Sequence, residues 1–201
     1  MIQNFDLGVT NLTPNFIGSW IIEDSLCDEL INYFENNYQK QQQGVSGSAA
    51  SINLDIKNRI DVRISPKDIN LSSNEVFKRY FVNLFECYKS YNNDWPFLKK
   101  MVTKLDIGAF NLGRYKKGQH FQKIHCERSG LGTLHRIFAF MTYLNTIDKG
   151  GATYFNHYDL KIQPQKGLTL IWPAEWTHTH RGNIVESGTK YMITGHLNFS
   201  L

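Results

Sequence analysis

The sequence has few cysteines and no long apolar run. Cys27, Cys87 and Cys126 are the only cysteines among 201 residues, and their wide spacing matches neither a disulfide framework nor a zinc knuckle. No stretch approaches the roughly 18 apolar residues that a membrane-spanning helix needs, and no charged-then-apolar leader opens the chain. We therefore expect a soluble, cytoplasmic protein in a reducing compartment.

Concentrated charge of one sign is also missing. The formal net charge is +4 at pH 7, and Lys and Arg are interleaved with Asp and Glu along the chain. Nucleic-acid-binding domains commonly carry a basic stripe instead. We predict neither a nucleic-acid partner nor a membrane partner, and the sequence leaves the oligomeric state open.

The first half of the chain has helical periodicity. Apolar residues recur at helical spacing over residues 26–38 and 76–88, which predicts two amphipathic helices. Residues 16–22 resemble a strand followed by a helix N-cap, and Ser72 with Glu75 predicts a capping box before the second helix. Residues 41–51 are typical of a loop, either an inert connection or a lid over a site, and residues 52–64 are expected to be extended.

The second half consists of short runs of β-branched and aromatic residues between turn residues. We expect about eight strands, over residues 101–115, 119–126, 134–144, 152–156, 159–163, 167–172, 177–184 and 189–199. This spacing predicts an all-β sandwich or a jelly roll. With 41% hydrophobic residues, the chain fits a single domain over 1–201, in which 1–99 form a helical prefix with extended segments and 100–201 form the jelly-roll core. The fold class is α+β, mainly β.

Two segments carry residues suited to a metal site. Side chains at i and i+2 of a strand share a face, so His125 and Glu127 can present an imidazole and a carboxylate to one point. A second imidazole from His180 would complete a two-histidine, one-carboxylate triad, which suits non-haem Fe(II) and leaves positions open for other ligands. Lys190 adds a cation ten residues later.

Two alternatives stay open from the residues alone. His178 lies two residues before His180 and would share its strand face, so either could be the distal ligand, although the spacing to Lys190 favours His180. Glu127 could instead pair with Arg128 or Arg136 and leave the metal with two histidines and water.

An ordered set of residues resembles the prolyl 4-hydroxylase-like branch of the Fe(II)/2-oxoglutarate-dependent oxygenases. The resemblance covers about residues 100–199 and is carried by Tyr115-x-x-Gly118, His125-x-Glu127, Arg136, Tyr143-Leu144-Asn145, Gly150-Gly151, Pro164-x-x-Gly167, Trp172-Pro173, His180-Arg181 and Gly188-Thr189-Lys190-Tyr191. One departure is Glu127, where the family usually has Asp. The extra methylene moves the carboxylate outward, so the resemblance implies iron binding with altered geometry.

The resemblance implies a double-stranded β-helix (jelly roll) braced by N-terminal helices, and it implies roles for individual residues. His125, Glu127 and His180 would bind Fe(II), and Lys190 would pair with the far carboxylate of 2-oxoglutarate. Tyr143 would hydrogen-bond the same carboxylate, and Tyr115 would lie near the other end of the co-substrate. Further residues that could line the pocket are His178, His196, Arg136 and Trp172, with Phe138, Phe140 and Phe155 as apolar neighbours that would keep it dry.

The implied activity is hydroxylation of a C–H bond with dioxygen as co-substrate and ascorbate as an optional reductant. The branch favours a prolyl residue in a peptide or protein. One alternative is hydroxylation of a free amino acid or another small metabolite. An alternative of a different class is a cupin-like metal-binding protein, isomerase or non-catalytic binding protein, which would have no need of the cation at Lys190.

Overall fold

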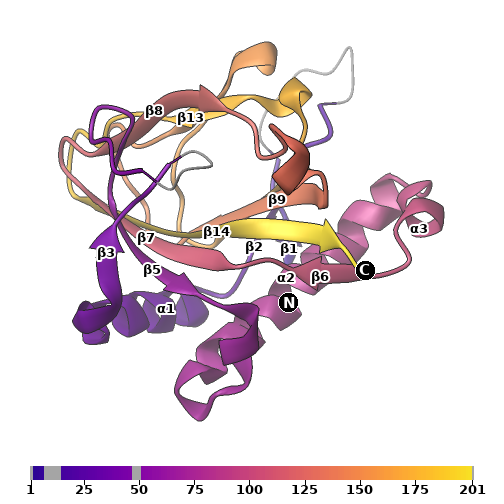
Figure 1. Cartoon of the computed structure of the whole chain (residues 1–201), viewed down its shortest axis with the longest axis horizontal. Coiled ribbons are helices and arrows are strands. Elements are labelled where there is room, and N and C mark those ends of the chain that lie inside the picture. The colour runs from indigo at the N-terminus through magenta and orange to yellow at the C-terminus, as the bar shows by residue number, and fades with distance from the viewer. Residues whose placement is uncertain (1, 7–14, 47–50, 201) are drawn as a thin grey trace.

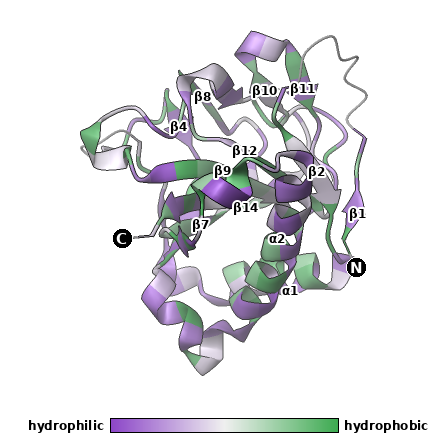
Figure 2. Ribbon diagram, turned by 90° about the vertical axis from the view of Figure 1, so that its right-hand side faces the viewer, coloured by the Kyte–Doolittle hydropathy of each residue, from purple (hydrophilic) through white to green (hydrophobic). Residues whose placement is uncertain are grey.

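A computed structural model describes residues 2–6, 15–46 and 51–200, in three layers. A small sheet lies on one side of a large sheet, and the two long helices lie on the other side (Figure 1). A view turned by 90° shows the same order, with α1 and α2 below β9, β12 and β14 and with β8, β10 and β11 above them (Figure 2). This arrangement is the predicted double-stranded β-helix braced by helices.

The large sheet has nine antiparallel strands. Its order is β1-β2-β12-β9-β14-β7-β5-β3, and β6 pairs with β14 beside this path. The bounds are β1 Gln3–Asn4, β2 Gly18–Ile21, β3 Gln41–Gln43, β5 Ile60–Ile64, β6 Leu105–Ile107, β7 Phe110–Lys116, β9 Arg136–Tyr143, β12 Leu168–Pro173 and β14 Thr189–Phe199. The run predicted over 101–115 is therefore two strands, and its first residue belongs to a short helix, α3 (Leu98–Met101).

The small sheet has five antiparallel strands in the order β11-β10-β13-β8-β4. They are β4 Lys57–Asn58, β8 His120–His125, β10 Thr153–Phe155, β11 Leu160–Ile162 and β13 His180–Gly182. Strands β8 and β13 are neighbours in this sheet, so two segments more than fifty residues apart in the chain lie side by side.

Alternation along the large sheet divides the core in two. On β9, Phe138 and Phe140 pack with the helices, whereas Ala139, Met141 and Tyr143 pack between the sheets. The expectation that Phe138 and Phe140 keep a pocket dry is therefore wrong, because Ala139, Met141 and Tyr143 are the residues of β9 that face the small sheet.

The long helices cover the outer face of the large sheet. They are α1 (Asp24–Asn36) and α2 (Glu75–Asp94), and the predicted apolar stripe of α2 is buried through Phe77, Tyr80, Phe81, Leu84 and Tyr88. Burying each such side chain contributes about 1.5–3 kcal/mol, so this face fixes the helix on the sheet.

The start of α2 differs from the predicted capping box. Ser72–Asn74 form a 3-10 turn, η3, and Asn74 is the N-cap without a side-chain hydrogen bond to the helix. The Asn74 side chain instead accepts a hydrogen bond from Tyr33 and donates one to the Asp68 carbonyl. Tertiary contacts therefore replace the local cap.

The segment around residue 45 reaches the inner side of the large sheet. Residues 47–50 of the loop predicted as a connection or lid lie outside the described residues, while Val45 and Ser46 line a cavity between the sheets. Among the helices that the structure describes, none is long and apolar enough to cross a membrane.

Candidate metal centre

Two histidines meet across the small sheet. His125 ends β8, His180 begins β13, and the two residues are direct partners in the antiparallel pairing. Their ring centroids lie 4.5 Å apart. Each Nδ1 contacts a backbone carbonyl, that of Lys123 at 2.8 Å for His125 and that of His178 at 2.9 Å for His180.

Those carbonyl contacts decide which ring nitrogen can bind a metal. A carbonyl oxygen only accepts hydrogen bonds, so each Nδ1 carries the proton and each Nε2 keeps a lone pair. Burial, followed by the charge of His180, lowers the pKa of His125 to about 4. His125 is therefore a neutral imidazole near pH 7, which is the form that coordinates metal ions.

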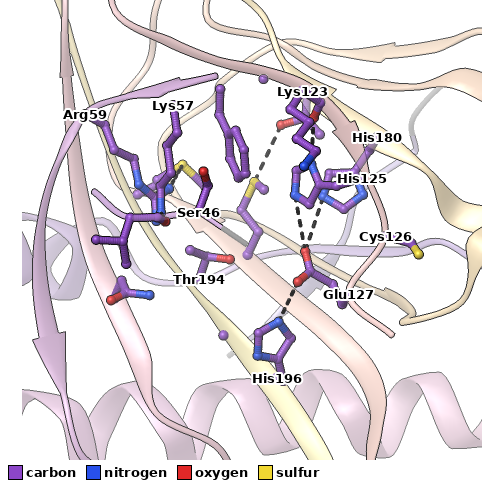
Figure 3. A pocket seen from close by; sticks show the side chains of 18 of the residues that line it. Ser46, Lys57, Arg59, Lys123, His125, Cys126, Glu127, His180, Thr194 and His196 are labelled. Atoms are coloured by element: carbon purple, nitrogen blue, oxygen red, sulfur yellow. Dashed lines mark hydrogen bonds and ion pairs between the residues drawn. The ribbon is translucent and has the colours of Figure 1, made fainter. Parts of the chain in front are cut away.

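Glu127 brings a carboxylate to the same point. Its Oε1 lies 3.6 Å from Nε2 of His125 and 3.5 Å from Nε2 of His180 (Figure 3). Its backbone N–H donates to the Ala174 carbonyl, which holds the residue beside the end of β12. Burial opposes ionisation of Glu127, but the charge of His196 and the imidazoles of His180 and His196 beside the carboxylate hold its pKa well below the usual range.

His196 contacts the other carboxylate oxygen of Glu127. Its Nε2 lies 2.7 Å from Oε2 of Glu127, so the two oxygens of the carboxylate have separate partners. His196 lies on β14 and therefore belongs to the large sheet, whereas His125 and His180 belong to the small one. The contact spans the space between the two sheets.

This donor set fits a metal ion. Donor atoms of His125, Glu127 and His180 all lie within 4.8 Å of one another. Neighbouring ligands of an octahedral ion with bonds of about 2.1 Å would be about 3 Å apart, so a small contraction brings these donors into range. Two imidazoles and one carboxylate match the facial triad of non-haem iron sites.

His178 lies elsewhere. It ends a 3-10 turn, η6 (Trp176–His178), so the expectation that it shares a strand face with His180 is wrong. Its Nε2 lies 2.8 Å from the Asn15 carbonyl, and His178 is not among the residues that line the cavity.

The arginines near Glu127 leave its Oε1 to the histidines. Arg128 pairs with Glu175 at 2.8 Å. Arg136 donates from Nη1 to the Glu127 carbonyl at 2.9 Å, and the same nitrogen is 3.9 Å from the carboxylate Oε2. Arg136 therefore pairs with Oε2 only near the limit of salt-bridge distance, and Oε1 stays beside the two histidines, so this pairing does not remove the carboxylate from the metal position.

Lys190 is a buried cation at the far end of the cavity. Its Nζ lies about 5 Å above the rings of Tyr115 and Tyr143, at 5.0 and 5.1 Å, and donates to the Gly151 carbonyl at 2.6 Å. Among the described residues, no carboxylate lies within salt-bridge distance of it. Burial, followed by the charge of Arg59, lowers its pKa to about 7. A buried ammonium without a carboxylate is costly, so the position suits an anionic ligand.

The two tyrosines expected near 2-oxoglutarate differ in what their hydroxyls contact. Tyr143 donates to Thr153 Oγ1 at 2.6 Å and is not among the cavity-lining residues. Tyr115 does line the cavity, and its hydroxyl accepts from Arg59 Nη1 at 2.8 Å.

Arg59 and Lys57 are cavity residues that sequence reasoning missed. Both are buried and share Asp61, whose Oδ1 is 2.6 Å from Arg59 Nε and whose Oδ2 is 3.1 Å from Lys57 Nζ. Charged residues at i, i+2 positions in the otherwise apolar run 56–64 were the available signal, because they indicate one charged inner face of a strand.

The site opens into a cavity of about 650 Å³ between the two sheets. Arg136 and His196 line it, as do all three proposed metal ligands. Trp172 lies behind the site, with its ring centroid 5.1 Å from that of His180, and Phe155 contacts the same imidazole at 5.4 Å. These two aromatic rings shield His180 from solvent.

Comparisons with known proteins agree with this geometry. Residues 110–198 match the family model described as the 2OG-Fe(II) oxygenase superfamily. No curated protein sequence is similar enough to this chain to count as a match.

Similar solved structures include three prolyl hydroxylases. The viral collagen prolyl hydroxylase of Paramecium Bursaria Chlorella virus-1, in its 2OG complex, is 19% identical over 92% of this chain and 97% of that chain, with a TM-score of 0.66. A Pseudomonas putida prolyl-4-hydroxylase is 14% identical (92% and 93%; TM-score 0.68). The prolyl hydroxylase of Trichoplax adhaerens, in complex with a hypoxia inducible factor oxygen degradation domain peptide fragment, is 18% identical (96% and 88%; TM-score 0.69). At these identities the similarity establishes the fold.

Proposed function

We propose, from the membership of residues 110–198 in the 2OG-Fe(II) oxygenase superfamily, that this protein is an Fe(II)- and 2-oxoglutarate-dependent dioxygenase that hydroxylates a prolyl residue in a peptide or protein. The observation that carries the proposal is the meeting of His125, Glu127 and His180 in one cavity with the buried cation Lys190. The fold shared with prolyl hydroxylases, one of them holding a peptide, supports the choice of substrate.

In this proposal His125, Glu127 and His180 hold the iron. When bound, Fe(II), 2-oxoglutarate and dioxygen supply the oxidising chemistry, in which 2-oxoglutarate becomes succinate and carbon dioxide and one oxygen atom enters the substrate C–H bond. The backbone carbonyls of Lys123 and His178 keep the two imidazoles in the tautomer that offers Nε2. Phe155 and Trp172 keep water away from the His180 side.

His196 acts as a positioning residue for Glu127. A glutamate has one more rotatable bond than an aspartate, so its carboxylate needs an additional restraint to stay in one place. The 2.7 Å contact from His196 holds Oε2 and leaves Oε1 to face the histidines. The family's usual aspartate would lie further from β14 by one methylene.

Lys190 binds the far carboxylate of 2-oxoglutarate. Its amine is fixed by the Gly151 carbonyl and by the two tyrosine rings. Gly150 and Gly151 both adopt positive φ values, 74° and 69°, which glycine reaches at little cost. Tyr143 supports the lysine through its ring face, and Tyr115 contributes its ring and its Arg59-bound hydroxyl.

Succinate formation from 2-oxoglutarate, measured beside the mass of the peptide product, tests the proposal. We expect Fe(II)-dependent succinate formation, with or without ascorbate, that rises with proline-containing peptides, and a peptide heavier by one oxygen atom. His125→Ala should abolish both. Stimulation by free amino acids and not by peptides would favour the metabolite alternative, and the absence of any 2-oxoglutarate turnover would contradict the oxygenase assignment.

A further inference from the structure

A polar row crosses the floor of the cavity. Arg63 on β5 pairs with Asn111 on β7, and Asn111 pairs with Thr194 on β14. All three residues line the cavity. By two-residue alternation Thr194 shares the inner face of β14 with Lys190 and His196, and in Figure 3 it lies between Arg59 and Glu127. The row therefore leads from the rim towards the metal centre.

The cavity wall carries far more positive than negative charge. Among the residues that the structure describes, the lining contains one carboxylate, Glu127, which the proposed metal would use, and six cationic side chains: Lys57, Arg59, Arg63, Lys123, Arg136 and Lys190. Asp61 lies beside two of them, Lys57 and Arg59, and Lys190 is assigned to 2-oxoglutarate. Lys123, Arg63 and Arg136 make up the remaining excess, and the last two lie on strands of the large sheet, where no co-substrate carboxylate is expected.

Arg63 has no anionic partner among the described residues. It is exposed at the rim, and no carboxylate there lies within salt-bridge distance of it. Arg136 is half-buried and is held at the Glu127 carbonyl. Both guanidinium groups line the same cavity. A carboxylate bound between them would accept charge-assisted hydrogen bonds from both.

We propose that Arg63, with Asn111, Thr194 and Arg136, forms an anion subsite, and that the substrate carries a carboxylate near the residue that is hydroxylated. The inference rests on the proposed function, since it concerns the substrate of the same site. Adjacent strands lie about 4.8 Å apart, so two strand spacings separate Arg63 from Thr194 by about 10 Å. An extended peptide rises about 3.3 Å per residue, so about three residues span this row, and the probes below place the carboxylate two or three residues from the target.

Equilibrium binding of labelled peptides to the Mn(II)-loaded protein tests this subsite independently of turnover. The probes are fluorescein-labelled octapeptides with one proline and with Asp, Asn or Lys two or three residues before or after it. We expect the Asp peptides to bind about tenfold or more tightly than the Asn peptides, and the Lys peptides to bind most weakly. Equal binding of all three, or tighter binding of Lys, would overturn the proposal.

Variants of Arg63 test whether this residue causes the preference for Asp peptides. Arg63→Gln should remove the Asp preference, and Arg63→Glu should reverse it in favour of Lys, while both keep the Mn(II) affinity of the parent. The matched control is Lys161→Ala, because Lys161 is an exposed lysine on β11 outside the cavity. This variant should change neither the Asp preference nor the Mn(II) affinity. An Asp preference that survives in Arg63→Glu would place the anion elsewhere and contradict the assignment.

Two carboxylate sources share this chemistry, and a second pair of probes separates them. Peptides that end two residues after the proline are compared as free acids and as amides. Tighter binding of the free acid assigns the subsite to a chain terminus, and preference for internal Asp assigns it to a side chain. Loss of succinate formation with every substrate, together with an intact Asp preference in binding, would contradict the proposed function and leave the anion subsite standing.

Discussion

At the scale of single residues, the candidate metal centre depends on hydrogen bonds that fix each ligand before a metal arrives. Both histidines carry their proton on Nδ1 because backbone carbonyls accept it, and Glu127 has one oxygen held by His196. Such partners commonly matter nearly as much as the ligands, since they set orientation and basicity. Glu127 is one methylene longer than an aspartate, and the imidazole of His196 lies within reach of this longer side chain.

Removal of the His196 imidazole should weaken metal binding. We expect His196→Ala to lower Mn(II) or anaerobic Fe(II) affinity about tenfold to 100-fold, because Glu127 loses its restraint. Calorimetric titration measures this loss. His196→Gln can still donate to the carboxylate and should recover part of the affinity.

Two controls separate positioning from general damage. His135→Ala removes an exposed imidazole away from the site and should leave metal affinity unchanged. In a Glu127→Asp background, where the carboxylate no longer reaches β14, His196→Ala should lower the metal affinity much less. Equal losses in both backgrounds would show that His196 does not act through Glu127.

The buried amine of Lys190 should make 2-oxoglutarate binding depend on pH. Burial and the charge of Arg59 lower its pKa to about 7, whereas a bound carboxylate favours the ammonium and raises the pKa in the complex. Affinity should therefore be highest below pH 7 and fall by up to about tenfold per pH unit above it. Titrations of the Mn(II)-loaded protein from pH 6 to 9 measure this slope.

Lys190→Arg provides the comparison, since arginine stays charged throughout this range. Its 2-oxoglutarate affinity should vary little with pH. Lys190→Ala should raise the 2-oxoglutarate requirement severely while sparing metal binding. A steep decline above pH 7 in Lys190→Arg would assign the titration to another group.

At the scale of secondary-structure elements, β14 organises the site because its alternate side chains serve two different cores. Ile193 and Leu197 pack towards the helices, whereas Lys190, Thr194 and His196 line the cavity. The strand therefore carries the proposed co-substrate cation and the residue that holds Glu127 on one face. A register shift of one residue would exchange these faces and remove the site.

The buried face of α2 should dominate the stability that this helix contributes. Leu84 is fully buried among the aromatic residues that cover the large sheet, so Leu84→Ala should lower the free energy of unfolding by about 2–5 kcal/mol. Urea denaturation measures the change. Val82→Ala, at a 64% exposed position of the same helix, should change stability by less than about 0.5 kcal/mol. Similar losses in the two variants would contradict the burial assigned to this face.

At the scale of the whole molecule, the proposed metal links the two sheets. Its ligands belong to β8, the residues just after it, and β13, while His196 connects Glu127 to the large sheet. A ligand that binds only the folded state stabilises it by about 2.7 kcal/mol at 100 times its Kd. The molecule should therefore unfold at a higher temperature with metal than without it.

Metal addition gives a simple measurement of this link. Saturating Mn(II) should raise the Tm by about 5–10 °C, given roughly 2–4 °C per kcal/mol for a chain of this size, and EDTA should reverse the shift. His125→Ala should abolish the metal-induced shift. An equal shift in that variant would show that Mn(II) stabilises the protein from another site.

Periodicity and spacing were enough to predict several features of the structure. The stripe of α2 and the strands of the second half follow from which residues can be buried together, and the pair His125 and Glu127 follows from the two-residue repeat of an extended chain. The double-stranded β-helix was implied by the family resemblance. The single domain over 1–201 stays a prediction. The predicted capping box at Ser72 was wrong because Asn74 is engaged by Tyr33 and Asp68.

The sequence by itself therefore determined the layers of the molecule and the residue types of its site, because hydrophobic repeat and local ligand spacing are written along the chain. Only the tertiary structure placed His180, and not His178, beside His125 and Glu127, brought His196 to Glu127, and placed Arg59, Arg63 and Lys57 around the cavity. Those relations join residues on strands far apart in sequence, and strand pairing, which no local pattern specifies, sets their distances.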